Sequence, residues 1–336
     1  MNLRAWEKKN DCLFLYEGKK MKFTGIDIGG TKCAVVTGNK DGIDEKISFP
    51  TTTVNETLDN IIKATEKLGA HNSIGISCGG PLDSKRGVIL SPPNLPGWDN
   101  IEIVNLFEKR FNVPVGLQND ANACALAEWK YGAGQGSQNM IFLTFGTGMG
   151  AGLILNGQLY SGTNDMAGEI GHIRISDYGP VGYGKAGSFE GFCSGSGIAE
   201  IGRMIARERL QLGQSTVFCK SYAELDSINA KDIAKYAKEG DEISMRIYDI
   251  CAEKLGVGLS ILIDILNPEK IVIGSVFERS GDLMRTIMQA VIDREALSYS
   301  KKICEILPAT LGDSIGDFAA IAIAENTLFE KGKAIL

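Results

Sequence analysis

The sequence lacks the features that define several large classes of protein. Its eight cysteines lie far apart, so no CxxC pair of the kind used for zinc binding or redox chemistry is present. Its most apolar helical stretch, residues 255–266, is much shorter than the roughly 20 residues that cross a membrane. Acidic residues outnumber basic ones by 41 to 35, whereas nucleic-acid binding requires a basic surface. We therefore expect neither a membrane protein nor a nucleic-acid-binding protein.

The start of the chain has no recognisable targeting signal. Residues 1–20 carry eight charged side chains, and their longest apolar run, Cys12–Leu15, is too short for a signal-peptide core. We treat them as an N-terminal extension, which is either an ordered arm or a segment upstream of an alternative start at Met21. Several cysteines, such as Cys33 and Cys78, lie inside apolar runs, where a thiol packs as a small hydrophobic group. These features predict a cytoplasmic protein with reduced, mostly buried cysteines.

Glycine is the residue in excess, with 41 in 336 residues. A chain of this length can form about two domains, each with its own core. Two stretches share one pattern, which is a strand, a glycine turn that contains threonine, and a second strand. The first covers residues 23–37 and the second covers residues 141–155. This repeat predicts two similar lobes that face one another.

Helical and strand patterns alternate along the chain, which indicates the α/β class. Residues 56–68 form a clear amphipathic helix, and we expect Asn55 to be its N-cap. The other expected helices cover residues 121–131, 198–210, 241–266 and 317–329, and expected strands include residues 73–77, 115–118 and 270–273.

The two glycine turns are candidate phosphate sites. A glycine turn exposes backbone N–H groups that can bind an anion, and Thr31 and Thr147 can add hydroxyl donors. Asp27 is placed to hold Mg²⁺ through water. The alternative is that both turns are merely tight hairpins. Neither a P-loop nor a dinucleotide fingerprint fits, because the first turn ends in Thr-Lys rather than Lys-Thr, and no strand precedes the GxGxxG of residues 182–187.

Six motifs follow one another in order along the chain. They are GIDIGGTK (residues 25–32), PNLPGW (93–98), NDANACALAE (119–128), FGTGMGAG (145–152), GEIGH (168–172) and NPEKIVIG (267–274). Together they resemble the ROK family of bacterial sugar kinases and related repressors, from about Met21 to the C-terminal helix. The resemblance implies an actin-like (ribonuclease H-like) ATPase fold with two lobes, and ATP and a hexose in the cleft between them.

The resemblance also implies the limits of the lobes and the ATP-binding residues. The smaller lobe would comprise residues 21–131 and 312–336, the larger lobe residues 132–311, and the protein would be a homodimer. Mg²⁺ would accompany the nucleotide. The implied ATP-binding residues are Gly29, Gly30, Thr31, Lys32, Gly146, Thr147, Gly148 and Gly274.

Asp120 is the candidate general base. An aspartate at a helix start is, taken alone, most simply an N-cap. Phosphoryl transfer to a hydroxyl needs a proton acceptor, and the NDAN motif carries the family's catalytic aspartate at this position. His172, taken alone, is more simply a hydrogen-bonded core histidine. The resemblance implies sugar contacts from Gly80, Asn94, Asn119, Glu169, His172 and Glu190.

One departure from the family concerns zinc. Many members carry a CxCGxxGCxE motif, whose cysteines bind zinc together with the histidine of GEIGH. Here Val181, Tyr183 and Ser188 stand at the three cysteine positions, while the closing Glu190 remains. Zinc needs about four ligands, so we expect no zinc site, and we expect Tyr183 and Phe189 to order this loop by packing.

These observations favour an ATP-dependent kinase that acts on the 6-hydroxyl of glucose or an N-acylhexosamine. The main alternative is a sugar-sensing regulator of the same family without catalysis. A repressor with a helix-turn-helix domain is disfavoured, because the residues before the first strand show no two-helix pattern.

Overall fold

The computed structural model describes residues 21–334, so the predicted N-terminal extension lies outside the described residues. Two compact units form, the first from residues up to 123 and from 316 onward, the second from residues 124–315. The chain leaves the first unit within α4 (Asp120–Tyr131) and returns to it at the start of α12 (Ile315–Ala334).

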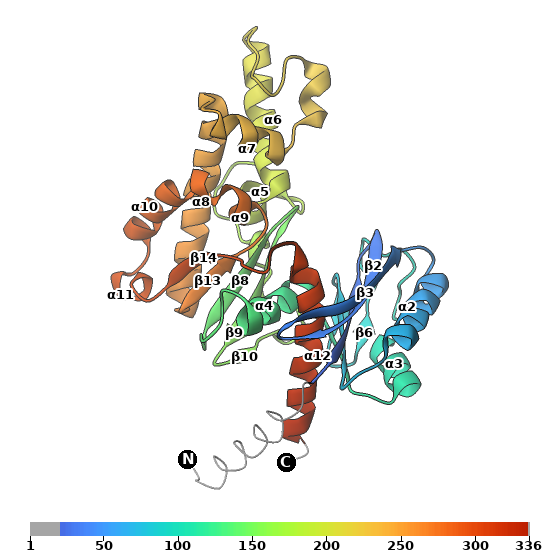
Figure 1. Ribbon diagram of the computed structural model, residues 1–336. Helices are drawn as coiled ribbons and strands as arrows, with labels where there is room; N and C mark the ends of the chain where they lie inside the picture. The colour runs from blue at the N-terminus through green and yellow to red at the C-terminus, as the bar shows by residue number, and fades with distance from the viewer. Residues whose placement is uncertain (1–20, 335–336) are drawn as a thin grey trace. The chain divides into compact units, whose positions relative to one another are not determined.

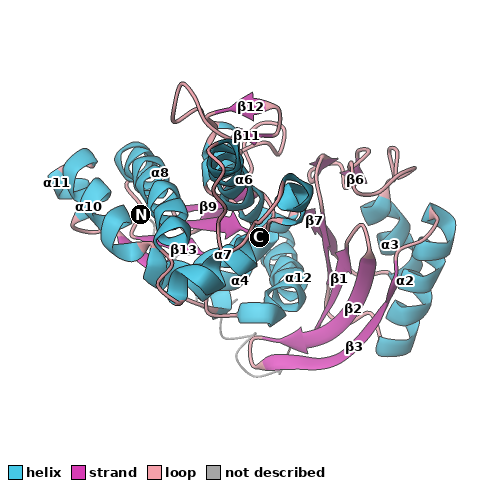
Figure 2. Ribbon diagram, turned by 90° about the horizontal axis from the view of Figure 1, so that it is seen from above, coloured by secondary structure: helices cyan, strands magenta, loops and turns pink. Residues whose placement is uncertain are grey.

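Each unit is built on a five-stranded mixed sheet, whose strands are magenta in Figure 2, and the two sheets share one topology. In both, a central strand pairs antiparallel with the strand that follows it and parallel with a later strand. The predicted repeat is thereby confirmed at the level of sheet topology. The first sheet has the order β3 (Gly42–Pro50), β2 (Lys32–Asn39), β1 (Phe23–Ile28), β4 (Ile74–Cys78), β7 (Val115–Gln118). The second has the order β10 (Gln158–Leu159), β9 (Met149–Leu155), β8 (Met140–Phe145), β13 (Lys270–Ile273), β14 (Glu305–Pro308).

The two faces of the first sheet carry different residues, because side chains alternate along a strand. One face bears Ile26 and its neighbours, which pack in one core with residues of α2 (Val54–Leu68) and α3 (Ile103–Phe111). The other face bears a row of three glycines, Gly25, Gly75 and Gly116, paired in register across β1, β4 and β7. A Cβ on any of them would collide with residues of α12. The glycine row therefore lets α12 lie directly on the sheet.

The N-cap of α2 differs from the prediction. Thr53, not Asn55, caps the helix, and its hydroxyl accepts a hydrogen bond from the Glu56 N–H at 3.4 Å. The helix therefore begins at Val54, and Asn55 lies in its first turn. Both residue types are favourable caps, so composition alone could not choose between them.

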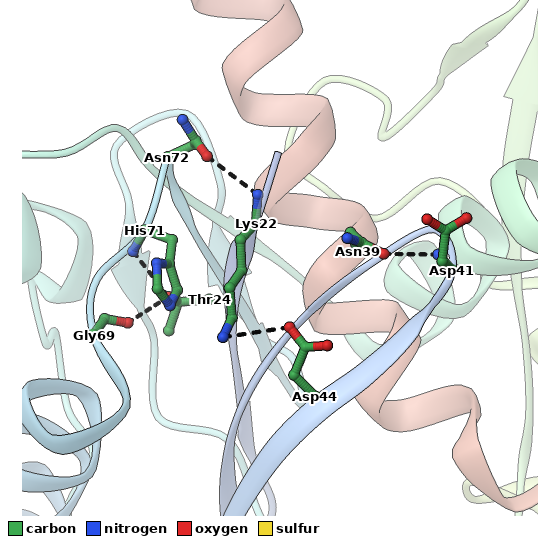
Figure 3. A network of polar contacts seen from close by, with 8 residues as sticks. All are labelled: Lys22, Thr24, Asn39, Asp41, Asp44, Gly69, His71 and Asn72. Atoms are coloured by element: carbon green, nitrogen blue, oxygen red, sulfur yellow. Dashed lines mark hydrogen bonds and ion pairs between the residues drawn. The ribbon is translucent and has the colours of Figure 1, made fainter. Parts of the chain in front are cut away.

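Polar contacts fix the start of β1 in the first unit (Figure 3). The Thr24 hydroxyl donates to the Gly69 carbonyl at 2.8 Å and accepts from the His71 N–H at 3.1 Å. The Lys22 ammonium lies 3.3 Å from the Asp44 carboxylate of β3. His71 thus belongs to a structural network.

The second unit surrounds its sheet with helices, of which α8 and α10 lie side by side (Figure 1). Its core includes the fully buried side chains of Phe145, Phe189 and Tyr248. The helices are α5 (Phe189–Phe192), α6 (Gly195–Gln211), α7 (Ala230–Lys238), α8 (Glu242–Leu266), α9 (Val276–Ser280), α10 (Arg285–Glu295) and α11 (Ser298–Lys301). Two short hairpins, β5 (Leu82–Asp83) with β6 (Val88–Ile89) and β11 (Val181–Gly182) with β12 (Lys185–Ala186), and the 3₁₀ turns Ile170–His172, Tyr222–Ser227, Gly281–Leu283 and Gly312–Ser314 complete the elements.

The seven described cysteines are free thiols, and five of them are buried, as predicted. Burial raises the pKa of Cys78 and of Cys304 to about 12, so these thiols stay protonated at neutral pH. Across residues 21–334, no helix combines the length and the apolar character that a membrane crossing requires.

Candidate active site

The first glycine turn links β1 to β2 and is held by the segment after β3. The Gly29 N–H donates to the Lys32 carbonyl at 3.2 Å, and the Gly29 carbonyl accepts from the Thr51 hydroxyl at 2.6 Å. A Cβ on Gly30 would meet the backbone carbonyl oxygen of Asn94, so Gly30 and the PNLPGW loop are in close contact. Thr31, Lys32 and Asn94 are exposed. This part of the site therefore presents an accessible glycine turn beside an accessible asparagine.

Three carboxylates of the first unit lie near one another. The pKa of Asp27 is raised to about 6. Burial is the largest cause, and the negative charges of Asp317 and Asp120 add to it. Lys46 opposes this effect, and its ammonium donates to both carboxylate oxygens of Asp317 at 2.7 Å. Gly316, in the first turn of α12, leaves room beside Asp27. The cluster is acidic and would attract a cation.

Asp120 is not the N-cap of α4. That position belongs to Asn119, whose side-chain oxygen accepts from the Asn122 N–H at 2.8 Å. The Asp120 carboxylate accepts a local hydrogen bond from the Ala121 N–H at 2.8 Å. Its side chain is accessible to solvent, yet desolvation by the surrounding protein raises its pKa above the usual value. Because another residue caps the helix, the Asp120 carboxylate is available for chemistry.

The sheet explains why these residues gather. Strands β1, β4 and β7 are parallel, so their carboxyl ends meet at one edge of the sheet. Asp27 lies at the end of β1, and Asn119 and Asp120 follow β7. Gly80 follows β4 and is exposed at the same edge, with open space where its Cβ would stand.

The second glycine turn, between β8 and β9, is held by the start of α6. The Gly146 carbonyl accepts from the Gly195 N–H at 2.7 Å, and the Thr147 carbonyl accepts from the Ser196 N–H at 3.3 Å. The Glu190 carboxylate accepts from the Met149 N–H at 3.0 Å. A Cβ on Gly148 would lie 2.6 Å from that carboxylate, so Glu190 lies directly against the turn.

Glu169 and His172 lie close to Glu190. Gly171, between them, packs so tightly that its Cβ would lie 3.2 Å from the Cβ of Glu190. Glu169 precedes a 3₁₀ turn that ends at His172, and both residues are exposed, so His172 is not a core histidine. The second unit therefore brings three of the predicted sugar-binding residues together.

A cavity of about 650 Å³ opens beside the second turn. It is lined by Gly146 and Thr147, by the start of α6, by one face of α7 and by Ser275. Gly274 is buried behind the lining, and its N–H donates to the Leu143 carbonyl at 3.0 Å. The charged lining residues are all basic: Arg203, Lys231, Lys235, Lys238 and Arg279.

Sequence analysis missed this basic lining. The spacing of Lys231, Lys235 and Lys238 on one helix places them on one face, a signal that could have been found. Ser275 and Arg279 gave no such signal. Ser275 has a left-handed φ of 56°, and its hydroxyl accepts from the Arg279 guanidinium at 3.0 Å. This contact holds Arg279 at the cavity.

The loop with the replaced cysteines corrects one expectation. Phe189 is buried, as expected, but Tyr183 is 84% exposed and does not pack in the core. The reason is that Tyr183 stands at the tip of the β11–β12 hairpin, where its ring meets His172 edge-on at 6.1 Å. Within residues 21–334, His, Cys, Asp and Glu form no group of three or more that could hold a metal directly.

A model of the ROK family matches residues 23–327 of the chain. The protein belongs to the ROK family. A glucokinase from Halalkalibacterium halodurans is 33% identical over 88% of this chain and 92% of that protein. The ROK glucokinase of Streptomyces griseus, solved with glucose and AMPPNP, is 29% identical and matches with a TM-score of 0.70 over 91% of this chain and 99% of that one.

The fold is thus the actin-like ATPase fold of the ROK sugar kinases, as the motifs implied. The family also contains regulators. A xylose repressor from Caldicellulosiruptor bescii is 32% identical over 66% of this chain, but the match covers only 55% of that repressor. Family membership therefore leaves catalysis to be argued from the site.

Proposed function

We propose that the protein is an ATP-dependent hexose kinase that phosphorylates the 6-hydroxyl of glucose or an N-acylhexosamine. The observation that carries the proposal is the state of Asp120. Its carboxylate is accessible, is released from helix capping by Asn119, and has a raised pKa. A carboxylate with these properties suits a general base, because a higher pKa strengthens its affinity for a proton.

Asp120 accepts the proton of the sugar hydroxyl as that oxygen attacks the γ-phosphate of ATP. Backbone N–H groups of the two turns, at Gly30–Thr31 and Thr147–Gly148, stabilise the negative charge that develops on the phosphates. The N–H groups of Gly29 and Gly146 donate within their own turns and hold the turns in shape. Lys32 contributes a positive charge at the first turn. The basic cavity beside the second turn, with Gly274 behind it, receives the rest of the nucleotide.

The hexose is oriented through its hydroxyls by Asn94 and Asn119 of the first unit and by Glu169, His172 and Glu190 of the second. Gly80 of the first unit also contacts the hexose. Glutamate and asparagine oxygens accept from sugar hydroxyls, while amide and imidazole N–H groups donate to them. The Glu190 carboxylate also accepts a hydrogen bond from the Met149 N–H, directly after the second turn. It therefore links the sugar site to the turn that contacts phosphate.

Asp27 fits a water-mediated role toward Mg²⁺. Its neighbours Asp120 and Asp317 make the site acidic, and Mg²⁺ keeps several of its waters when it binds with phosphates. When bound, Mg²⁺ neutralises phosphate charge. In this role Asp27 accepts hydrogen bonds from the metal's waters.

An ADP-release assay with Mg·ATP tests the proposal against glucose, mannose, fructose, N-acetylglucosamine and N-acetylmannosamine. We expect strong turnover with one sugar. If no sugar is turned over while some sugars raise the melting temperature, the protein is a sugar-sensing regulator, and the kinase proposal fails.

The family resemblance supports a homodimer, and the free, mostly buried thiols suit a cytoplasmic location. Size-exclusion chromatography with light scattering tests the oligomeric state, and a monomeric mass at working concentration would contradict the dimer.

A further inference from the structure

The hairpin of β11 and β12 is fastened to the segment that begins at His172. The Lys185 ammonium donates to the His172 carbonyl at 2.7 Å, and the Tyr183 ring meets the His172 ring edge-on, with 6.1 Å between centroids and 77° between planes. Two residues further, the Arg174 guanidinium donates to the Ala186 carbonyl at 2.6 Å. We call residues Val181–Ala186 the clamp hairpin.

Backbone bonds continue this attachment beyond the hairpin. The Ile175 N–H donates to the Gly187 carbonyl at 2.9 Å, and the Phe189 N–H donates to the Ile173 carbonyl at 2.8 Å. Phe189 itself is fully buried in the core of the second unit. The clamp hairpin is thereby anchored at its base, while its tip reaches His172.

Two of the three residues that replace the cysteines hold the clamp hairpin and its neighbours together. Tyr183 supplies the ring on His172, and the buried Ser188 hydroxyl donates to the Gly182 carbonyl at 3.4 Å and accepts from the Gly191 N–H at 3.1 Å. Val181 at the third position is exposed. Side chains that cannot bind zinc therefore make non-covalent links in the same stretch of chain.

The backbone at the tip directs the tyrosine ring. Tyr183 and Gly184 have φ values of 45° and 74°, and they form the two-residue turn of the hairpin. Two left-handed residues are what a tight two-residue hairpin requires, and a large side chain is uncommon at the first of them. The strained placement of a tyrosine here calls for a compensating role, which the His172 contact supplies.

We propose that Tyr183 and Lys185 are positioning residues for His172, and that they fix its imidazole and its carbonyl for hexose binding without a metal. Lys185 fixes the backbone of His172, and the edge-on ring of Tyr183 restricts rotation of the imidazole. Pre-orienting a ligand-binding side chain lowers the entropy cost of binding. The inference rests on the proposed contact of His172 with the hexose.

Imidazole NMR tests the contact independently of activity. The chain has only two histidines, and His71 lies in the other unit, within the network of Figure 3, where it serves as an internal reference. In Tyr183→Asn, which keeps a residue that tolerates a left-handed φ, we expect the His172 ring resonances to move and those of His71 to stay. Tyr178→Asn is the matched control, because Tyr178 is 85% exposed in the same segment.

Steady-state kinetics test the consequence. We expect Lys185→Met to raise KM for the hexose about tenfold, the loss equivalent to one charge-assisted hydrogen bond. Tyr183→Asn should raise it about two- to tenfold, the loss equivalent to one aromatic contact. KM for ATP and the turnover at saturating hexose should stay near wild type. Tyr183→Phe and Lys185→Arg, which retain the ring and the donor, should restore the wild-type hexose KM.

The outcomes separate the two proposals. If the wild-type protein phosphorylates a hexose but both variants keep its KM, or if the His172 resonances do not move, the clamp hairpin has no positioning role. One zinc per chain in the purified protein would also overturn it. If the wild-type protein phosphorylates no hexose, the proposed function fails, and the NMR result still reports on the contact.

Discussion

The two glycine turns have the same scaffold and opposite electrostatic surroundings. Each joins a central strand to its antiparallel neighbour in a sheet of identical topology. The first turn lies in a unit where three carboxylates interact, those of Asp27 and Asp120 at the sheet edge and that of Asp317 on α12. The second adjoins a cavity whose charged lining residues, among those the structure describes, are all basic.

The difference shows that the hairpin is the common frame and that its neighbours determine its chemistry. Carboxylates suit proton transfer and a hydrated metal ion, whereas lysine and arginine suit an anionic nucleotide. The neighbours come from distant parts of the chain, such as α12 for the first turn and α7 for the second. Substituting one neighbour at a time therefore tests whether the two turns differ in this way.

The largest expected effect is on catalysis at the acidic edge. Asp120→Asn should reduce turnover by roughly 10²–10⁴, the range for losing a general base, because the amide cannot accept the hydroxyl proton. The hexose Kd, measured by calorimetry, should stay within a few fold of wild type. Asp59→Asn on the exposed face of α2 is the control. Unchanged turnover in Asp120→Asn would remove the residue from its role.

A second effect concerns stability. The folded-state pKa of Asp27 is raised to about 6 from 3.8, so the folded state holds this proton more tightly than the unfolded chain. Stability from this group is thus greatest below pH 3.8 and falls as pH rises to about 6. Asp27→Asn should raise the free energy of unfolding above pH 6, by at most about 3 kcal/mol.

This gain should disappear well below pH 3.8, where Asp27 is protonated in both the folded and the unfolded state. Denaturant unfolding at about pH 3 and about pH 8 measures it, with Asp41→Asn at the exposed β2–β3 turn as the control. If Asp27→Asn is less stable than wild type at pH 8, the charge of Asp27 does not destabilise the folded state, and the prediction is wrong.

Alanine at the two turns compares them directly. A Cβ on Gly30 would collide with the backbone of Asn94, whereas the nearest atom to a Cβ on Gly146 is the Ser275 hydroxyl oxygen at 3.9 Å. Gly30→Ala should therefore destabilise the protein by about 1–3 kcal/mol, and Gly146→Ala by less than about 0.5 kcal/mol. Thermal unfolding of the pair measures this, and equal losses would show that the turns have similar surroundings.

The smallest expected effect lies at the basic cavity. Arg279→Met should raise KM for ATP about tenfold, because it removes one guanidinium from the nucleotide, and should leave KM for the hexose unchanged. Arg207→Met, on the exposed side of α6, is the control. If KM for the hexose rises instead, the cavity does not hold the nucleotide.

Much of the fold could be predicted from local patterns. Strands such as β7 and β13 were predicted with their bounds, because short apolar runs lie between turn residues. The N-cap of α2 was not, because Thr53 and Asn55 are equally plausible caps. The long strand β3, which alternates exposed and half-buried residues, and helix α7 were not identified.

Less of the site could be predicted. The motifs pointed to Asp120 as the general base, to Glu190 as a sugar-binding residue and to the glycine turns as ATP-binding segments. These roles stay predictions. They could not show that Asn119 caps α4, because this depends on side-chain direction at a helix start. Nor could they show that Arg279 reaches the cavity through Ser275, or that Tyr183 contacts His172, since both contacts depend on backbone with positive φ.

Phosphorus NMR of the reaction product tests the central claim most directly. The wild-type protein, Mg·ATP and the best sugar of the panel should yield one new phosphate monoester, with coupling to the protons on carbon 6. Asp120→Asn should yield the same product at a rate lower by roughly 10²–10⁴. A phosphate on another hydroxyl, or equal rates for the two proteins, would contradict the account.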